Sequence, residues 1–343
     1  MGAIMSAMGS LPANVSTIPM RCLVGATVVF NEPICREHFR LRLGLPGRFS
    51  PTKPGQFVQL GCRPPGGGQN QEALLGQCIE WDTAIPPKLT QTELCEELAL
   101  LRRPFSLAGR GDNATGTWID VIHRVVGTGT QWLAHLAAGD RVDLIGPLGN
   151  QFELPDDKSL GLLVGGGVGL PPMFYLAQWM HQAGWDVVGF VGATTRDLLA
   201  VTCNSGQEPD PGGLPTHCIE EFSQFNFPAV VTTDDGSQGL MGRVTDGLEP
   251  LLRGLSVPRR RQAVVFVCGP QAMMQATAHL AQAYGVDCQV CLEQAMACGM
   301  GTCQSCVVKI HDQPGDIGET GDWRYKLACT DGPVFNAQDV AWA

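Results

Sequence analysis

The segment from Glu293 to Cys306 reads EQAMACGMGTCQSC and places three cysteines at the spacing C-x4-C-x2-C. These are Cys298, Cys303 and Cys306, and a fourth, Cys329, follows later in the chain. The spacing is typical of plant-type [2Fe–2S] sites, in which thiolates hold the iron. Glycines between the cysteines let the backbone wrap tightly around such a cluster. The alternatives are buried free cysteines or a zinc site, although zinc sites built on C-x2-C usually contain two such pairs.

The composition is that of a globular protein with two or three domains. The chain has 343 residues, of which 44% are hydrophobic and 16% charged, so sizeable cores are expected. The formal net charge of −10 argues against nucleic acid as a partner. Glycine contributes 43 residues, which suits turns and phosphate-binding loops.

The cysteine content bears on the cellular compartment. Fourteen cysteines would suit a disulfide scaffold in a short secreted protein. This chain is long, its cysteines do not pair by spacing, and residues 1–20 lack the basic and apolar regions of a signal peptide. We therefore expect a cytoplasmic protein with mostly free thiols. No run of about 18 apolar residues occurs, so no transmembrane helix is expected, and residues 1–18 predict a flexible tail.

The N-terminal third predicts an antiparallel β-barrel. Residues 22–30 are rich in strand formers, apolar and basic residues alternate over 39–43, and a Pro-Gly turn precedes a further strand at 56–60. Short strands broken by glycine and proline are typical of barrels. Residues 63–100 interrupt this pattern, and we interpret them as an insertion between barrel strands.

The next predicted strand carries a motif suited to a flavin. An arginine can bind pyrophosphate oxygens, an aromatic ring can stack on the flavin, and a hydroxyl can hydrogen-bond near its N5 atom. The candidate contacts on this strand are Arg103, Pro104, Phe105 and Ser106. Taken alone, the motif is weak, and a surface strand that carries a stray arginine is the better interpretation.

A strand over 118–125 and a glycine turn strengthen the flavin interpretation. The strand contributes the candidate contacts Ile122, His123 and Arg124, with His123 interpreted as a strand residue instead of a catalyst. The turn opens a helix, and the free N–H groups of a helix N-terminus can bind an anion. Its candidate contacts are Gly127, Thr128, Gly129 and Thr130.

The middle third predicts an α/β domain that binds a nucleotide. A short apolar strand at 160–164 leads into the turn GGGVGLPP and then into a helix from Met173 to Gln182. Strand, glycine turn and helix form the context that a nucleotide loop needs, and proline fits a first helical turn. The candidate contacts in the turn are Gly165, Gly166, Gly167 and Gly169.

Three more strands are predicted at 186–193, 229–233 and 263–267, the last followed by a helix at 271–284. Ligands of open parallel sheets lie at the carboxyl ends of the strands. The turns after the last two strands contribute the candidates Asp234, Asp235, Cys268, Gly269 and Pro270. A nucleophilic cysteine or an aspartate metal site are alternatives. No base lies nearby in sequence, so we interpret the cysteine as a packing or nicotinamide-side contact and the aspartates as a nucleotide-contacting turn.

Together these motifs resemble the ferredoxin–NADP reductase superfamily and, within it, the family of class 1B dihydroorotate dehydrogenase electron-transfer subunits. The resemblance runs from about Met20 to Trp342 apart from the insertion. It rests on the segments at 103–106, 127–130, 146–149, 165–169, 233–237, 268–270, 292–306 and 329–335.

The resemblance implies a multi-domain α/β plus β fold in three parts. These would be an FAD-binding antiparallel barrel at 19–157, a NAD-binding parallel-sheet α/β domain at 158–288 and a small [2Fe–2S] domain at 289–343. In that family, electrons from dihydroorotate leave the FMN of a separate catalytic subunit and cross the cluster to FAD, which reduces NAD⁺ in pyrimidine biosynthesis. The implied assembly is a heterotetramer of two relay and two catalytic subunits.

The chain departs from the family pattern in three places. The insertion is longer than the family's loop, 22 residues separate Cys306 from Cys329, and Phe105 stands where a tyrosine is common. The long gap predicts an extended hairpin around 312–325, and stacking by Phe105 survives without the phenol's hydrogen bond.

Two other functions remain as alternatives. They are the small subunit of an NAD(P)H–ferredoxin or sulfide-type oxidoreductase and a non-catalytic iron–sulfur regulator. The choice between NAD and NADP stays open. Arg196 is either a contact to a 2′-phosphate or an ordinary surface arginine.

Overall fold

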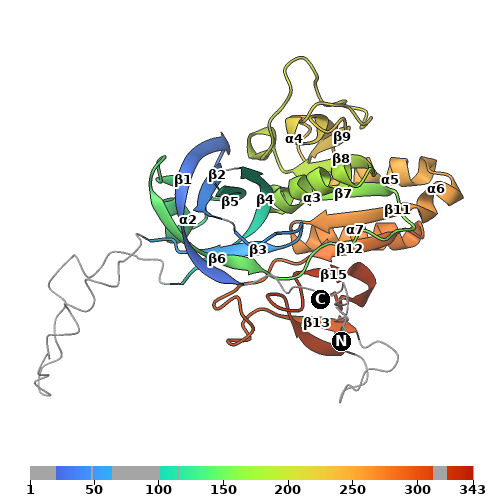
Figure 1. The fold of residues 1–343 in the computed structure, drawn as a ribbon. Helices are drawn as coiled ribbons and strands as arrows, with labels where there is room; N and C mark the ends of the chain where they lie inside the picture. Colours follow the sequence, from blue (N-terminus) through green and yellow to red (C-terminus); the bar gives the residue numbers. More distant parts are fainter. Residues whose placement is uncertain (1–20, 48, 64–100, 114–115, 312–322, 343) are drawn as a thin grey trace, which may run out of the picture.

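The computed structural model describes residues 21–47, 49–63, 101–113, 116–311 and 323–342, arranged as a barrel, an α/β sheet and a C-terminal hairpin region (Figure 1). The expected tail at 1–18 lies outside the described residues. So does the expected insertion at 63–100, apart from its first residue.

The N-terminal part closes into an antiparallel six-stranded barrel, in the order β1-β2-β5-β4-β3-β6, which confirms the prediction. Its strands are β1 (Cys22–Cys35), β2 (His38–Pro46), β3 (Phe57–Leu60), β4 (Arg103–Asn113), β5 (Gly116–Arg124) and β6 (Arg141–Leu148). The alternation in β2 explains its orientation, because Leu41 and Leu43 are fully buried in the barrel core. Arg40 and Arg42 lie on the other face, where both donate to the buried carboxylate of Asp120.

The middle part forms a seven-stranded sheet in the order β10-β9-β8-β7-β11-β12-β15, parallel except for β15. Its strands are β7 (Leu160–Gly166), β8 (Asp186–Ala193), β9 (Ala229–Thr233), β10 (Leu240–Met241), β11 (Ala263–Cys268), β12 (Asp287–Cys291) and β15 (Val334–Asn336). The strands β7, β9 and β11 are buried at every residue. Such continuous apolar runs are expected where helices cover both faces of a parallel sheet.

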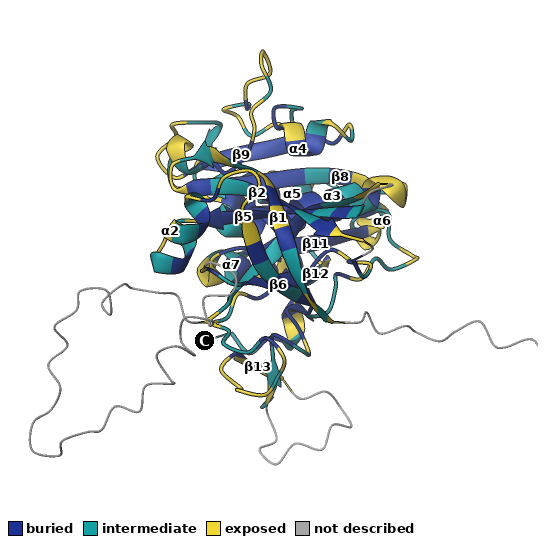
Figure 2. Cartoon of the chain, turned by 60° about the vertical axis from the view of Figure 1, so that its left-hand side comes forward, coloured by how far each residue is buried: buried dark blue, intermediate teal, exposed yellow. Residues whose placement is uncertain are grey.

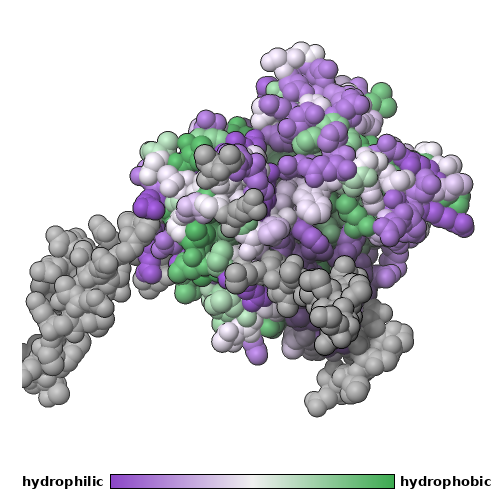
Figure 3. Space-filling view, in the orientation of Figure 1, coloured by the Kyte–Doolittle hydropathy of each residue, from purple (hydrophilic) through white to green (hydrophobic). Residues whose placement is uncertain are grey.

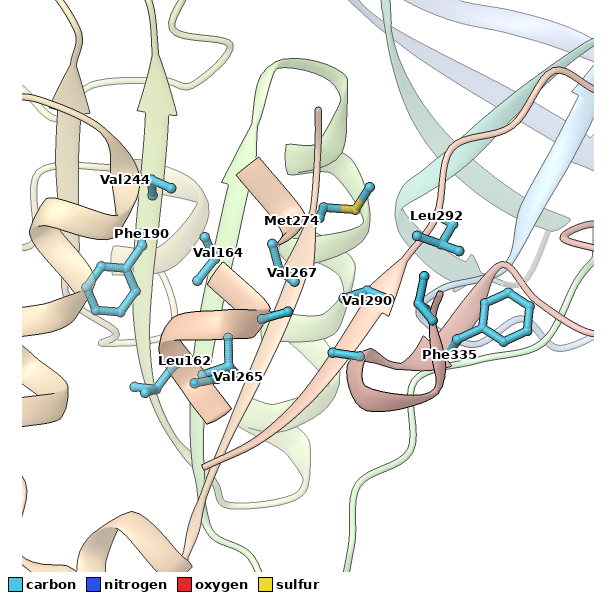
Figure 4. Packing of buried hydrophobic residues seen from close by; sticks show 14 of the residues in the cluster. Leu162, Val164, Phe190, Val244, Val265, Val267, Met274, Val290, Leu292 and Phe335 are labelled. Atoms are coloured by element: carbon cyan, nitrogen blue, oxygen red, sulfur yellow. The ribbon is translucent and has the colours of Figure 1, made fainter. Parts of the chain in front are cut away.

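Helices cover both faces of this sheet. On one face, α3 (Leu170–Gln182) and α4 (Glu220–Ser223) pack against it; on the other, α5 (Val244–Gly254) and α7 (Gln271–Ala283) do so. Figure 4 labels Val244 of α5 and Met274 of α7 in the cluster on this second face. The shorter elements are α2 (Thr128–Ala134), α6 (Val257–Arg261), η2 (Gly167–Gly169), η3 (Arg196–Leu198) and η4 (Ala337–Asp339). Among the described residues, no helix has the length and apolarity needed to cross a membrane.

Helix α3 begins three residues before the predicted start at Met173. Pro171 and Pro172 occupy its first turn, where a missing N–H leaves no hydrogen bond unmade. The prolines therefore belong to the helix, and the glycine-rich turn is correspondingly shorter.

The C-terminal region is a hairpin that shares its core with the sheet domain. β13 (Val307–His311) pairs with β14 (Trp323–Leu327), and the expected extension between them, 312–322, lies outside the described residues. Strand β15 adds to the sheet beside β12, so the boundary expected at 288/289 falls inside β12. Figure 4 shows Phe335 close to Val290 and Leu292 at this junction.

The barrel and the sheet domain are joined through α3. The Tyr175 hydroxyl donates to the Thr52 carbonyl oxygen at 2.9 Å and lies 2.7 Å from the Thr52 hydroxyl. The Gln178 amide donates to the Arg110 carbonyl oxygen on β4 at 3.2 Å. Buried residues follow the strands of both parts (Figure 2). This packing holds the two parts at a fixed separation.

Candidate functional site

A cleft of about 1700 Å³ lies between the barrel and the carboxyl ends of the sheet strands. Its walls come from β4 and β5 on the barrel side and from the turns after β7, β9 and β11 on the sheet side. The predicted contacts that line it are Arg103, Pro104, Phe105, Ser106, Ile122, His123, Arg124, Gly127, Thr128, Gly129, Thr130, Gly166, Gly167, Gly169, Asp234, Cys268, Gly269 and Pro270. The predicted contacts Gly165 and Asp235 do not line it.

The barrel end of the cleft carries the motif on β4. The half-buried Arg103 donates to the Leu101 carbonyl oxygen at 2.9 Å, which holds the guanidinium close to the strand. Phe105 lies edge-on to His123, with ring centroids 6.1 Å apart. An arginine and an aromatic ring on one strand of an open cleft can bind a phosphate and a flat ring, respectively.

His123 is a neutral core residue. It is 1% exposed, stacks on Phe39 with ring centroids 5.7 Å apart, and its ring nitrogens have no hydrogen-bond partner in the described part of the chain. Burial lowers the pKa of His123 to about 4, and the neighbouring His38 contributes to this lowering. The side chain therefore carries no charge at neutral pH, in agreement with its interpretation as a strand residue.

Hydrogen bonds within the turn before α2 occupy some of its backbone N–H groups. The Thr130 hydroxyl accepts hydrogen bonds from the amides of Val126 at 2.9 Å and Gly127 at 3.2 Å. These two N–H groups are consequently occupied, and a phosphate at this turn would have to use others.

The glycine-rich turn packs directly against the turn after β11. A Cβ atom on Gly169 would lie 2.1 Å from the Cys268 carbonyl oxygen, and one on Gly166 would lie 2.9 Å from the Met273 sulfur. Gly165 does not line the cleft. It allows close packing, because a Cβ atom there would lie 2.7 Å from the Leu170 side chain. Absence of side chains brings the backbone to the cleft surface, as a pyrophosphate site requires.

Cys268 is a protonated thiol within the wall. It shares a hydrogen bond with Cys291 on the paired strand, and this bond together with burial raises the pKa of Cys268 well above its usual range. A thiol in that state is a poor nucleophile. The structure therefore favours a packing or ligand-contact role.

The two aspartates after β9 differ in role. Asp234 lines the cleft, whereas the exposed Asp235 carboxylate accepts from the amide and the hydroxyl of Ser237, which lowers the pKa of Asp235. Asp235 thus shapes the turn. Arg196 is exposed and does not line the cleft, while Arg243, at the start of α5, does.

Sequence reasoning missed several lining residues. They include His38, Thr194, Arg243, Met273 and the segment Leu292–Met296. Arg243 lies immediately before α5, where the rules for helix starts favour Ser, Thr, Asp or Asn, so those rules gave no signal for it. The others carry no local signature and reach the cleft through tertiary packing.

The cysteine loop directly follows the lining segment Leu292–Met296. The Cys298 sulfur accepts from the backbone amides of Met300 and Cys303, both at 3.4 Å. Gly299, Gly301 and Gln304 have positive φ angles, which lets the loop turn these amides inward. Amides directed at sulfur are a feature of iron–sulfur sites and influence their reduction potential.

The four cysteines fall into two pairs. Cys303 is exposed, contacts Cys298, and has a pKa lowered to about 6, chiefly because of a hydrogen bond with the Ser305 hydroxyl. Cys306 and Cys329 are buried and in contact, and burial raises the pKa of Cys329 to about 11. The loop supplies both cysteines of the first pair and Cys306 of the second, and Cys329 comes from the segment after β14.

The pairing fits a two-iron cluster. Two pairs of thiolates fit a [2Fe–2S] cluster with four cysteine ligands. The donor chemistry therefore supports the iron–sulfur interpretation of Cys298, Cys303, Cys306 and Cys329.

Residues 293–341 match the model of the family described as iron-sulfur cluster binding domain of dihydroorotate dehydrogenase B. The chain is also similar to proteins named dihydroorotate dehydrogenase B (NAD(+)), electron transfer subunit. The relative from Geobacillus thermodenitrificans is 38% identical over 243 residues, covering 70% of this chain and 80% of the relative. Those from Desulforamulus reducens and Streptococcus pneumoniae are 34% and 32% identical, covering 71% of this chain and 81% and 82% of the relatives.

Solved structures show the same architecture. A chain from the structure of an NADH-dependent reduced ferredoxin-NADP oxidoreductase, described as a flavin-based electron-bifurcating enzyme, superposes with a TM-score of 0.65 at 26% identity. The match covers 92% of this chain and 90% of that one. The ferredoxin reductase of carbazole 1,9a-dioxygenase matches with a TM-score of 0.53 at 19% identity, over 80% of this chain and 68% of that one. The latter likeness concerns the fold alone.

Proposed function

The chain belongs to the family of electron transfer subunits of dihydroorotate dehydrogenase B, and from this we propose that it passes electrons from a catalytic partner that oxidises dihydroorotate to NAD⁺. The observation that carries the proposal is a cleft shared by three groups of residues. It is lined by the β4 motif, the nucleotide turns and the segment that leads into the cysteine loop. Sites for a flavin, a nucleotide and a cluster are thereby adjacent.

FAD, a [2Fe–2S] cluster and NAD are the cofactors of this oxidoreductase subunit. Together they supply one-electron transfer through iron and two-electron transfer as hydride between flavin and nicotinamide. The chain's own residues bind and orient these groups.

We assign the barrel wall to FAD. Arg103 would bind the pyrophosphate, and Phe105 would stack against the flavin or its ribityl chain, with Ser106 placed to hydrogen-bond near N5. The sheet wall, from Gly166 to Gly169 and from Cys268 to Pro270, would bind NAD, since its exposed backbone can approach a pyrophosphate closely.

Replacement of Arg103 by alanine is expected to weaken FAD binding. A hydrogen bond to a charged group contributes about 1.5–3 kcal/mol, so the FAD dissociation constant should rise between about tenfold and about 150-fold. The measurement is flavin fluorescence during titration of flavin-depleted protein. Arg102→Ala is the matched control, because Arg102 donates to the Asp143 carbonyl oxygen and does not line the cleft. Equal FAD affinity in both variants would show that Arg103 does not bind the FAD pyrophosphate.

The partner is a catalytic subunit, as the family implies. We propose that this partner contains FMN, that two copies of each subunit form a cytoplasmic heterotetramer, and that the partner docks beside the cysteine loop. Met300, Val307 and Tyr325 are 49%, 39% and 59% exposed there. Apolar side chains exposed beside a redox centre suit a protein interface. Elsewhere on the face seen in Figure 3, hydrophobic and hydrophilic residues are mixed, and the part over α4 and β9 is mainly hydrophilic.

Co-expression with a dihydroorotate dehydrogenase catalytic subunit tests the function. We expect a stable complex that reduces NAD⁺ when dihydroorotate is added, with the mass of a heterotetramer by light scattering. The chain alone should oxidise NADH with an artificial acceptor but leave dihydroorotate unchanged. Dihydroorotate oxidation by the chain alone would contradict the division of labour.

A second candidate is the small subunit of an NAD(P)H–ferredoxin or sulfide-type oxidoreductase. The observation in its favour is the likeness, over 92% of this chain, to a ferredoxin-NADP oxidoreductase chain. The same experiment separates the two. Co-purification with a larger iron–sulfur flavoprotein, and no complex with the dihydroorotate-oxidising subunit, would support the second candidate.

A further inference from the structure

Two side-chain amides of the barrel region hold the two arms of the cysteine site. Gln59 lies in β3 and is 1% exposed, although its side chain is polar. In the β3–β4 ladder it stands opposite Pro104, within the motif assigned to the flavin. Because buried amides are retained where they make specific hydrogen bonds, the contacts of Gln59 are informative.

Gln59 contacts the backbone on both sides of Cys298. Its Nε2 atom donates to the Ala297 carbonyl oxygen at 3.4 Å. On the other side, a Cβ atom on Gly299 would lie 2.8 Å from Gln59 Cδ, so the amide packs flat against this glycine. Gly299 has a φ angle of 68°, which favours glycine for a second reason. The first cysteine is thereby fixed against the barrel.

Asn150 holds the other arm. Its Nδ2 atom donates to the carbonyl oxygens of Val334 at 2.8 Å and Asp331 at 3.0 Å, and its Oδ1 atom accepts from the Val334 amide at 2.9 Å. The segment 331–334 closely follows Cys329. Each pair of thiolates therefore has one adjacent backbone segment anchored to the barrel region by an amide side chain.

We propose that Gln59 is a positioning residue for electron transfer between FAD and the cluster. One residue joins the strand beside the flavin motif to the backbone around Cys298, and it does so from a buried position. It fixes the separation of the two redox groups, on which the rate of electron transfer depends steeply. The proposal rests on the proposed function, because it assumes that FAD and the cluster exchange electrons in this chain.

The chemistry of the residue explains why a glutamine is required. A leucine would fill a similar volume without donating to Ala297, so the loop would be held by packing alone. A glutamate would place a carboxylate against that carbonyl oxygen and repel it. A displacement of about 1 Å in the groups that support a preorganised site is enough to impair that site.

Stopped-flow reduction of the holoprotein by NADH separates the two electron-transfer steps. Hydride from NADH first reduces FAD with two electrons, and one electron then passes to the cluster. In Gln59→Leu and Gln59→Glu, flavin reduction should keep its wild-type rate. Cluster reduction should slow by between about tenfold and a hundredfold, the cost of a misplacement of about 1 Å. Iron content and the EPR signal of the reduced cluster should match wild type.

The control is Gln56→Leu. Gln56 is a buried glutamine of the same barrel that donates to the Gly149 carbonyl oxygen and does not touch the cysteine loop. It should leave both rates unchanged. An unchanged rate of cluster reduction in both Gln59 variants would overturn the proposal. Loss of the cluster from both variants would also overturn it, because Gln59 would then be needed to retain the cluster and not to position it. Failure of the wild-type flavin to accept electrons from NADH would instead contradict the proposed function.

Discussion

The Cys303→Ser protein is expected to lose the visible absorbance and the EPR signal of the [2Fe–2S] cluster while it keeps FAD. Cys303 is exposed, and its sulfur lies 3.2 Å from the Ser305 hydroxyl of the same loop. The substitution therefore removes a ligand without opening a cavity. Serine is a much poorer ligand for iron than a thiolate, so iron content should fall toward zero.

The Cys303→Ser substitution should affect one of the two measurable activities and leave the other intact. NADH oxidation with an artificial two-electron acceptor should persist, because it needs FAD and NAD only. Reduction of NAD⁺ by dihydroorotate in the complex with the catalytic subunit should fall to background. Cys203→Ser is the matched control, since Cys203 is also exposed but lies in the sheet domain. A Cys303→Ser protein with full iron content would show that this cysteine is not a ligand.

The Gly169→Ala protein is expected to be strongly destabilised and to bind NAD poorly. A Cβ atom at this position would lie 2.1 Å from the Cys268 carbonyl oxygen, 2.3 Å from its carbon and 2.5 Å from the Gly269 nitrogen. These are backbone atoms at the end of a buried strand, which cannot rotate away. Overpacking typically costs about 1–3 kcal/mol, and we expect the upper end of this range because the clashing atoms belong to the backbone.

Thermal unfolding and NADH titration measure the two effects of Gly169→Ala. Movement of the glycine turn away from β11 would widen the sheet wall of the cleft, so both stability and NADH affinity should fall. Gly254→Ala is the control, because a Cβ there meets nothing within 4 Å. Wild-type stability together with wild-type NADH affinity in Gly169→Ala would show that the turn can move without loss.

Most of the fold was predictable because its signals are local. Alternating residues in β2 and the apolar runs of β8 and β9 depend on near neighbours along the chain. Strand β12 escaped prediction, since its place in the sheet depends partly on β15, which lies more than 40 residues later. The boundary expected at 288/289 failed to anticipate this pairing, because no local pattern reveals it.

The candidate site was predictable to the extent that it consists of motifs. The β4 motif and most of the glycine turns do line one cleft, whereas Asp235 turned out to satisfy its own turn. Residues such as His38 and Met273 reach the cleft without any sequence signature. Their side chains are brought there by the packing of whole elements, which composition and spacing do not encode.

The sequence alone determined which groups could hold iron and where nucleotide-binding turns occur, because those depend on the spacing of a few neighbouring residues. Only the tertiary structure decided how the cysteines pair, as Cys298 with Cys303 and Cys306 with Cys329. It also decided that Gln59, more than 230 residues away in the chain, supports the first of these pairs. Such contacts arise when the closed barrel and the extended sheet pack together, since packing brings distant segments within hydrogen-bonding distance.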